Sequence, residues 1–85
     1  MGKRQIQKSN TIMKEIINHV EGILKNYDIS FRNLNSYHTK MLFLEANNAL
    51  RLKSYLKENF HKEIKLNEAE ELEILLQTYQ YLSQN

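Results

Sequence analysis

The fold is decided by residues 36–61, SYHTKMLFLEANNALRLKSYLKENFH, which contain neither glycine nor proline. Apolar residues recur in this stretch and just ahead of it at steps that suit one α-helical face. That face consists of Leu34, Met41, Leu42, Ala46, Ala49, Leu52, Leu56 and Phe60. Asn35 or Ser36 fits the N-cap position in front of it. We therefore expect one long helix from about residue 36 to residue 61.

Two further amphipathic helices are expected on either side of this stretch. The first, from about residue 5 to 26, presents a stripe formed by Met13, Ile17, Val20, Leu24 and Tyr27. The last begins at Asn67, because Asn67 and Glu70 have the spacing of a capping box. Its buried stripe consists of Ala69, Leu72, Leu75, Leu76, Tyr79 and Leu82. Residues 1–8 are expected to form a flexible basic arm.

The composition agrees with an all-α protein. The 85 residues include two glycines, no proline and no cysteine, so turn-rich folds, disulfides and thiolate metal sites are disfavoured. We expect residues 1–85 to form a single helical domain, a small antiparallel bundle of three main helices. Dimerisation is a second way in which so small a core could be completed.

Membrane insertion and secretion find no support in the sequence. No apolar run approaches the ~20 residues that span a bilayer. The basic N-terminus is not followed by the apolar segment of a secretory signal. We therefore expect a cytoplasmic protein without a transmembrane segment.

A second stripe on the helix expected at 36–61 is the main functional feature. It lies opposite the core face and consists of Tyr37, Met41, Leu44, Asn48, Arg51 and Tyr55, flanked by Phe43 and Leu50. Tyrosine, arginine and methionine are enriched in protein–protein interfaces. The stripe therefore predicts binding of another protein or self-association. If the helix is instead central, both stripes are internal and Asn48 is a buried polar residue that needs a partner.

Nucleic-acid binding is a less favoured alternative. Phosphate contacts would come from Lys3, Arg4, Lys8 and Lys14, with Arg51, Lys53 and Lys57 adding charge. However, residues 25–57 carry six basic and two acidic side chains, a net charge of +4, whereas residues 58–85 carry two and six, a net charge of −4. A dedicated nucleic-acid binder usually has a more uniformly basic surface.

Metal and catalytic motifs are sparse. Glu58 and His61 have the Glu-x-x-His spacing of di-iron bundles, and a metal-binding helical dimer is a further alternative. Such sites usually need more carboxylates, and the core stripes offer only Glu45. Glu45 near His38 and Lys53 could be a perturbed carboxylate, but the favoured interpretation is that it pairs with Lys53 or reaches water at the edge of the bundle. With no nucleophile motif and no glycine-rich phosphate loop, we expect neither cofactor, metal nor enzymatic activity.

Residues 62–72, KEIKLNEAEEL, resemble the helix-connecting stretch of pediocin-type bacteriocin immunity proteins, which are small helical bundles. The resemblance covers about one eighth of the chain and implies binding to a membrane receptor. The chain also has the general profile of phage-encoded inhibitors of host proteins, which are small and lack catalytic motifs. We expect a regulatory or inhibitory protein-binding module.

Overall fold

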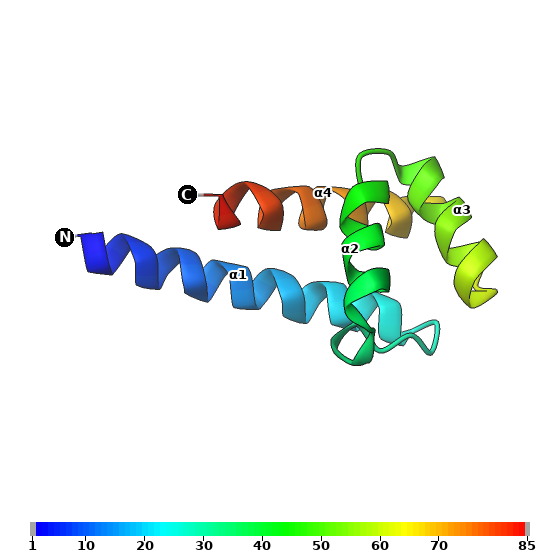
Figure 1. Cartoon of the computed structure of the whole chain (residues 1–85), viewed down its shortest axis with the longest axis horizontal. Coiled ribbons are helices and arrows are strands. Elements are labelled where there is room, and N and C mark those ends of the chain that lie inside the picture. Colours follow the sequence, from blue (N-terminus) through cyan, green and yellow to red (C-terminus); the bar gives the residue numbers. More distant parts are fainter. Residues whose placement is uncertain (1, 85) are drawn as a thin grey trace.

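The computed structural model describes residues 2–84, and the side chains of residues 10–84. Four α-helices and one 3₁₀ turn follow one another: α1 (Gly2–Lys25), η1 (Phe31–Asn33), α2 (Ser36–Glu45), α3 (Ala49–Phe60) and α4 (Leu66–Ser83) (Figure 1). No strand occurs within residues 2–84. The all-α class expected from the sequence is confirmed, but the number of main helices is four and not three.

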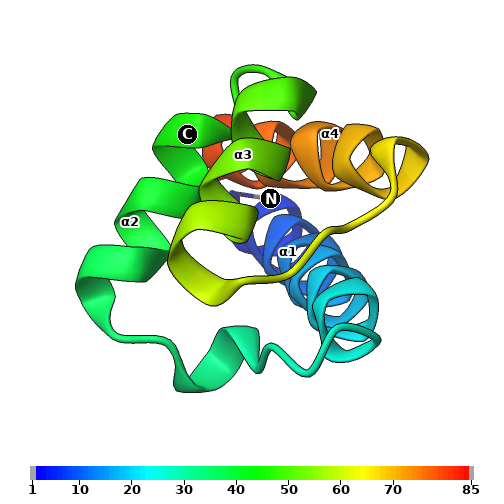
Figure 2. The same cartoon turned by 90° about the vertical axis from the view of Figure 1, so that its right-hand side faces the viewer.

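The helices form two parts with a shared core. α1 and α4 lie side by side in opposite directions, and α2 and α3 pack across them near one end (Figures 1 and 2). The fully buried side chains come from both parts and include Val20, Leu24, Leu42, Leu52, Leu56, Ile64, Leu72 and Leu76. Because α1 and α4 extend beyond α2 and α3, the molecule measures 45 × 24 × 22 Å.

The expected helix 36–61 is broken at residues 46–48, which corrects the sequence prediction. The Asn48 side chain accepts hydrogen bonds from the backbone of Leu50 at 2.8 Å and Arg51 at 3.3 Å, so Asn48 is the N-cap of α3. The carbonyl of Ala46, where α2 ends, accepts a 2.8 Å hydrogen bond from Gln77 Nε2 of α4. Polar groups that a helix break exposes are therefore satisfied on both sides of it.

The helix of the first segment begins earlier than expected. α1 starts at Gly2, so residues 2–8 are helical where the sequence predicted a flexible arm. Residues 3–8 are Lys, Arg, Gln, Ile, Gln and Lys, which have good or moderate helix propensities and include no breaker. The stripe of this helix packs as expected at Val20 and Leu24, which are fully buried.

The start of α4 differs from the predicted capping box. Its N-cap is Lys65, which makes no side-chain cap, and Asn67 lies inside the first turn. The capping partner comes from another part of the chain: the Tyr27 hydroxyl accepts a 3.2 Å hydrogen bond from the Lys65 backbone and donates one to Glu68. The predicted capping box at Asn67 and Glu70 is thus wrong, because a distant tyrosine takes over its role.

A second cap of this kind holds η1. The Glu21 carboxylate of α1 accepts hydrogen bonds from the backbone of Phe31 at 3.1 Å and of Arg32 at 3.0 Å. Arg32 in turn donates through its guanidinium to the Asn18 side chain, one turn away from Glu21 on α1. These contacts fix the connection between α1 and α2 against α1, and Phe31 is buried there.

Candidate functional site

The break at Asn48 converts the predicted second stripe into the surface of a helical hairpin. Tyr37, Met41 and Leu44 lie on α2, and Arg51 and Tyr55 lie on α3. Tyr37 is 65% exposed, Leu44 54% and the flanking Leu50 62%. Met41 is partly buried against the core. We call Tyr37, Leu44, Leu50 and Arg51 the hairpin surface.

Tyr55 and Asn48 do not play the parts that the stripe suggested. Tyr55 is buried, and its hydroxyl lies 2.8 Å from His38 Nδ1 of α2. Burial, together with the nearby Tyr37 and Glu45, raises the pKa of Tyr55 above its ordinary value. Asn48 is exposed and caps α3, so it is not the buried polar residue of a central helix. Tyr55 therefore joins the two helices of the hairpin instead of facing a partner.

Aromatic rings reinforce that joint. The His38 ring lies 5.0 Å from the Phe60 ring and 6.3 Å from the Tyr55 ring, measured between centroids. The exposed Tyr37 ring stands edge-on to His38 at 5.6 Å. The first turn of α2 is consequently anchored to the second half of α3, which gives the hairpin surface a fixed backbone.

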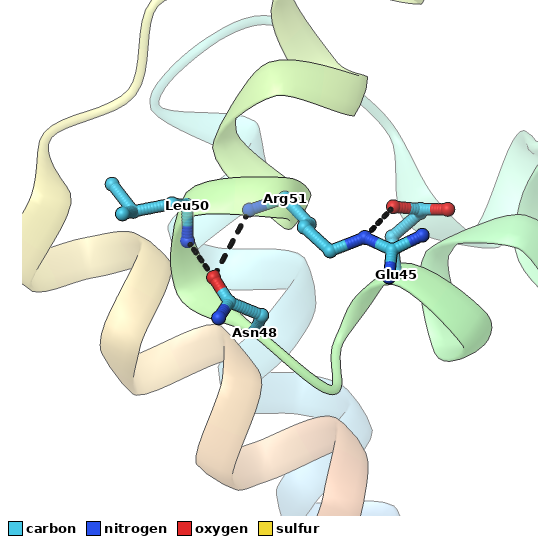
Figure 3. Close-up of polar contacts among 4 residues, drawn as sticks. All are labelled: Glu45, Asn48, Leu50 and Arg51. Carbon is cyan, nitrogen blue, oxygen red and sulfur yellow. Dashed lines mark hydrogen bonds and ion pairs between the residues drawn. The ribbon is translucent and has the colours of Figure 1, made fainter.

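Glu45 and Arg51 close the other end of the hairpin. Arg51 Nε lies 3.3 Å from Glu45 Oε2, while its backbone N–H donates to Asn48 (Figure 3). The Glu45 side chain is 18% exposed, whereas Arg51 lies largely in solvent. Glu45 thus forms its ion pair with Arg51 and not with Lys53, the partner expected from the sequence. A carboxylate held in this way stabilises the turn between α2 and α3.

A shallow hollow of about 310 Å³ lies beside this ion pair. Its lining consists of Glu45, Leu50, Arg51, Ser54, Tyr55 and Glu58. Leu50 was predicted only to flank the stripe, and Ser54 was not predicted. The hollow places an apolar side chain next to an exposed cation and to the edge of a tyrosine.

The structure describes the side chains of only some of the residues predicted to contact nucleic acid. Lys14 is exposed on α1 and lines a separate hollow together with Arg32 of η1. The side chains of Lys3, Arg4 and Lys8 lie outside the part of the chain whose side chains are described. Lys14 and Arg32 come together although they are far apart in sequence, and no sequence signal pointed to Arg32.

Glu58 and His61 remain separate surface residues. His61 ends α3 in the left-handed conformation, with φ 59°, and both side chains are exposed. Among the described residues, no group of three or more histidine, aspartate or glutamate side chains is arranged to hold a metal ion. Within residues 2–84, no helix combines the length and the apolar character needed to cross a membrane.

Comparison of the chain with models of protein families, with characterised proteins and with solved structures found no match.

Proposed function

We propose that this chain is a non-enzymatic module that binds another protein through its hairpin surface and thereby regulates or inhibits it. The observation that carries the proposal is the exposure of Tyr37, Leu44 and Leu50, each more than half exposed, on the two helices that also carry Arg51. Large exposed apolar side chains are candidates for contact with another protein when they form a patch. Tyrosine and arginine are the residue types that most often dominate binding energy.

The shape of the surface favours a helical segment of the partner. The hollow of about 310 Å³ between Leu50, Arg51 and Glu58 is open to solvent and large enough to take single side chains of a partner. Apolar residues spaced along a partner helix would rest on Leu44 and Leu50, in the helix-in-groove mode of recognition. An acidic partner residue would compete with Glu45 for Arg51.

The hairpin is held in one conformation before any partner arrives. Asn48 caps α3, Tyr55 joins His38, and Gln77 ties the end of α2 to α4. A surface fixed in this way loses little conformational entropy on binding, which favours affinity.

Site-specific photo-crosslinking would test the proposal in cells that encode the chain. A photoreactive phenylalanine analogue replaces Leu44 or Leu50 in turn, and Ile74 on α4 serves as the matched control because it is 65% exposed. We expect one and the same protein to be crosslinked from positions 44 and 50 and not from position 74. Crosslinking that is equal at all three positions, or absent at 44 and 50, would contradict the proposal.

A titration with the purified crosslinked protein would then measure the contribution of each side chain. Leu44→Glu and Leu50→Glu should each weaken binding at least about tenfold, equivalent to about 1.4 kcal/mol. Ile74→Glu should leave the affinity unchanged. All three variants should keep the helical circular dichroism, because these side chains lie mainly in solvent. Equal loss of binding with Ile74→Glu would show that the hairpin surface is not the site.

A further inference from the structure

A second and chemically different site lies where α1 and α4 extend beyond the hairpin. At this end the two helices lie side by side without α2 and α3 across them (Figure 1). Met13, Ile17, Tyr79 and Leu82 are only partly buried near this end, where the Phe43 ring of α2 still packs 5.6 Å from the Tyr79 ring. A hollow of about 540 Å³ opens there, lined by Asn10, Met13, Lys14, Ile17, Asn18, Arg32 and Tyr79.

The lining divides into an apolar part and a cationic part. Met13, Ile17 and Tyr79 supply carbon surface, while Lys14 and Arg32 are exposed cations. The described lining contains no carboxylate; Glu21, which lies outside it, accepts hydrogen bonds from the backbone N–H groups of Phe31 and Arg32. The amides of Asn10 and Asn18 add neutral hydrogen-bonding groups. Two cations beside an apolar surface match a ligand that carries an anionic head on an apolar body.

Arg32 is held at the edge of the hollow by contacts from α1. Its guanidinium donates to the Asn18 side chain, and its backbone N–H donates to Glu21 at 3.0 Å. The η1 turn that carries Arg32 is anchored by the buried Phe31. Arg32 is therefore oriented before a ligand binds, which lowers the entropic cost of using it.

We propose that this hollow binds an amphipathic anion, a carboxylate attached to an aliphatic or aromatic body. The carboxylate would lie between Lys14 and Arg32, where charge-assisted hydrogen bonds are strongest. The apolar body would cover Met13, Ile17 and Tyr79. The volume falls within the range of about 300–1,000 Å³ that is usual for small-molecule sites.

A second copy of the chain fits the same surface less well. A twofold symmetric dimer sets one patch against the identical patch of its partner. Here that pairing would bring Lys14 and Arg32 close to the same two cations, without a carboxylate from the described lining to separate them. The charge of the hollow therefore favours an anionic ligand over self-association.

A titration with three matched probes distinguishes the contribution of the ligand's anionic head to binding from that of its apolar body. Octanoate carries both the charge and the chain, octanol only the chain, and acetate only the charge. In amide NMR spectra of the full chain, octanoate should shift the signals of residues 10–18, 32 and 79 saturably and at least tenfold more tightly than octanol. Acetate should cause no saturable shift. Equal binding of octanol, or shifts spread over the whole chain, would overturn the proposal.

Charge-removing variants provide the second test. Lys14→Gln combined with Arg32→Gln should weaken the binding of octanoate at least tenfold and leave the binding of octanol unchanged. Lys40→Gln on α2 serves as a control and should change neither affinity. If Lys40→Gln weakens octanoate equally, the effect is general electrostatics and the site is refuted. Shifts at residues 10–18 that depend on protein concentration without ligand would instead indicate a second copy in the hollow. Because positions 44 and 50 lie outside the hollow, the crosslinking result does not depend on this one.

Discussion

The α2–α3 hairpin and the α1–α4 pair are held by different kinds of interaction. In the hairpin, the polar contacts join residues no more than 17 positions apart: Asn48 caps α3, Glu45 pairs with Arg51, and His38 contacts Tyr55. Between α4 and α1 or the turn that follows α1, they join residues about 40 or more apart, such as Tyr27 with Glu68 and His19 with Glu71 at 2.7 Å. Short helices need caps and local contacts, whereas long amphipathic helices depend mainly on burial.

The two candidate surfaces differ in the same way. On the hairpin surface, the charge of Arg51 is already opposed by Glu45, so exposed apolar side chains dominate. In the hollow between α1 and α4, Lys14 and Arg32 face no carboxylate among the described lining residues. The first surface therefore suits a protein with apolar anchors, and the second suits a small anion. If the two sites are independent, substitutions that weaken binding at one of them should leave binding at the other unchanged.

The largest expected effect is on the free energy of unfolding, and it tests whether the α2–α3 hairpin and the α1–α4 pair unfold as one unit. Leu56 of α3 and Leu76 of α4 are both fully buried in the shared core. Leu56→Ala and Leu76→Ala should each lower the free energy of unfolding by about 2–5 kcal/mol, because burial is lost and a cavity remains. Urea unfolding followed by circular dichroism would measure this.

A matched control is Leu44→Ala, which removes the same atoms from an exposed position and should change stability by less than about 0.5 kcal/mol. Amide hydrogen exchange should show that Leu56→Ala accelerates exchange in α1 and α4 as well as in α3. If only α2 and α3 were affected, the hairpin would be an independent unit and the shared core would not control its stability.

The break between α2 and α3 should respond to its cap. Asn48→Ala removes the side-chain acceptor for the backbone N–H groups of Leu50 and Arg51 and should cost about 0.5–2 kcal/mol. Asn47→Ala, at the neighbouring exposed position, is the control and should have little effect. A stabilised Asn48→Ala variant with increased helix content would mean that α2 and α3 prefer to merge.

The sequence predicted the buried residues better than it predicted the ends of helices. Val20, Leu42, Leu52, Leu56, Leu72 and Leu76 were assigned to the core by their spacing, and all are buried. The break at Asn48 was missed because Ala46, Ala49 and Leu52 keep a helical spacing across it. The position of the break depends on a contact that is distant in sequence: Gln77 donates a hydrogen bond to the carbonyl of Ala46, 31 positions away.

The residues of the candidate sites could likewise be predicted within one helix but not where helices pack together. Tyr37, Leu44 and Arg51 were singled out from residues 36–61 alone and are exposed, since one face of each helix follows from periodicity. Tyr55 was assigned to the same face, yet the hairpin folds it against His38. The hollow containing Lys14 could not be predicted, because Arg32 and Tyr79 reach it only after α1, η1 and α4 have packed together.

A smaller effect is expected at the tyrosine that caps α4. Tyr27→Phe removes the hydroxyl that links Lys65 and Glu68 and should cost about 0.5–1.5 kcal/mol. The hydrogen bond to Glu68 is the main cause that raises the pKa of Tyr27 above its ordinary value. The folded protein thus holds this proton more tightly than the unfolded chain, so the contribution is complete below about pH 10 and is lost as pH rises through the folded-state pKa.

Thermal unfolding at pH 8 and pH 11 would reveal this dependence. The wild type should lose more stability between the two pH values than Tyr27→Phe does. Tyr55 also has a raised pKa, so Tyr27→Phe should keep a residual loss at high pH that Tyr55→Phe reduces. Identical pH profiles for the wild type and Tyr27→Phe would show that the hydroxyl does not cap α4.

The smallest effect is expected where the hairpin meets the connection to α4. Lys57 Nζ lies 2.6 Å from Glu63 Oε1, but both side chains are well exposed, so Lys57→Gln should hardly change the melting temperature. The hydrogen bond from Lys57, followed by its charge, lowers the pKa of Glu63. Any stabilisation is therefore present above the ordinary carboxyl pKa and is lost as pH falls through the folded-state pKa. An NMR titration should show the Glu63 pKa rising in Lys57→Gln and with added salt, whereas an unchanged pKa would mean that the pair does not form in solution.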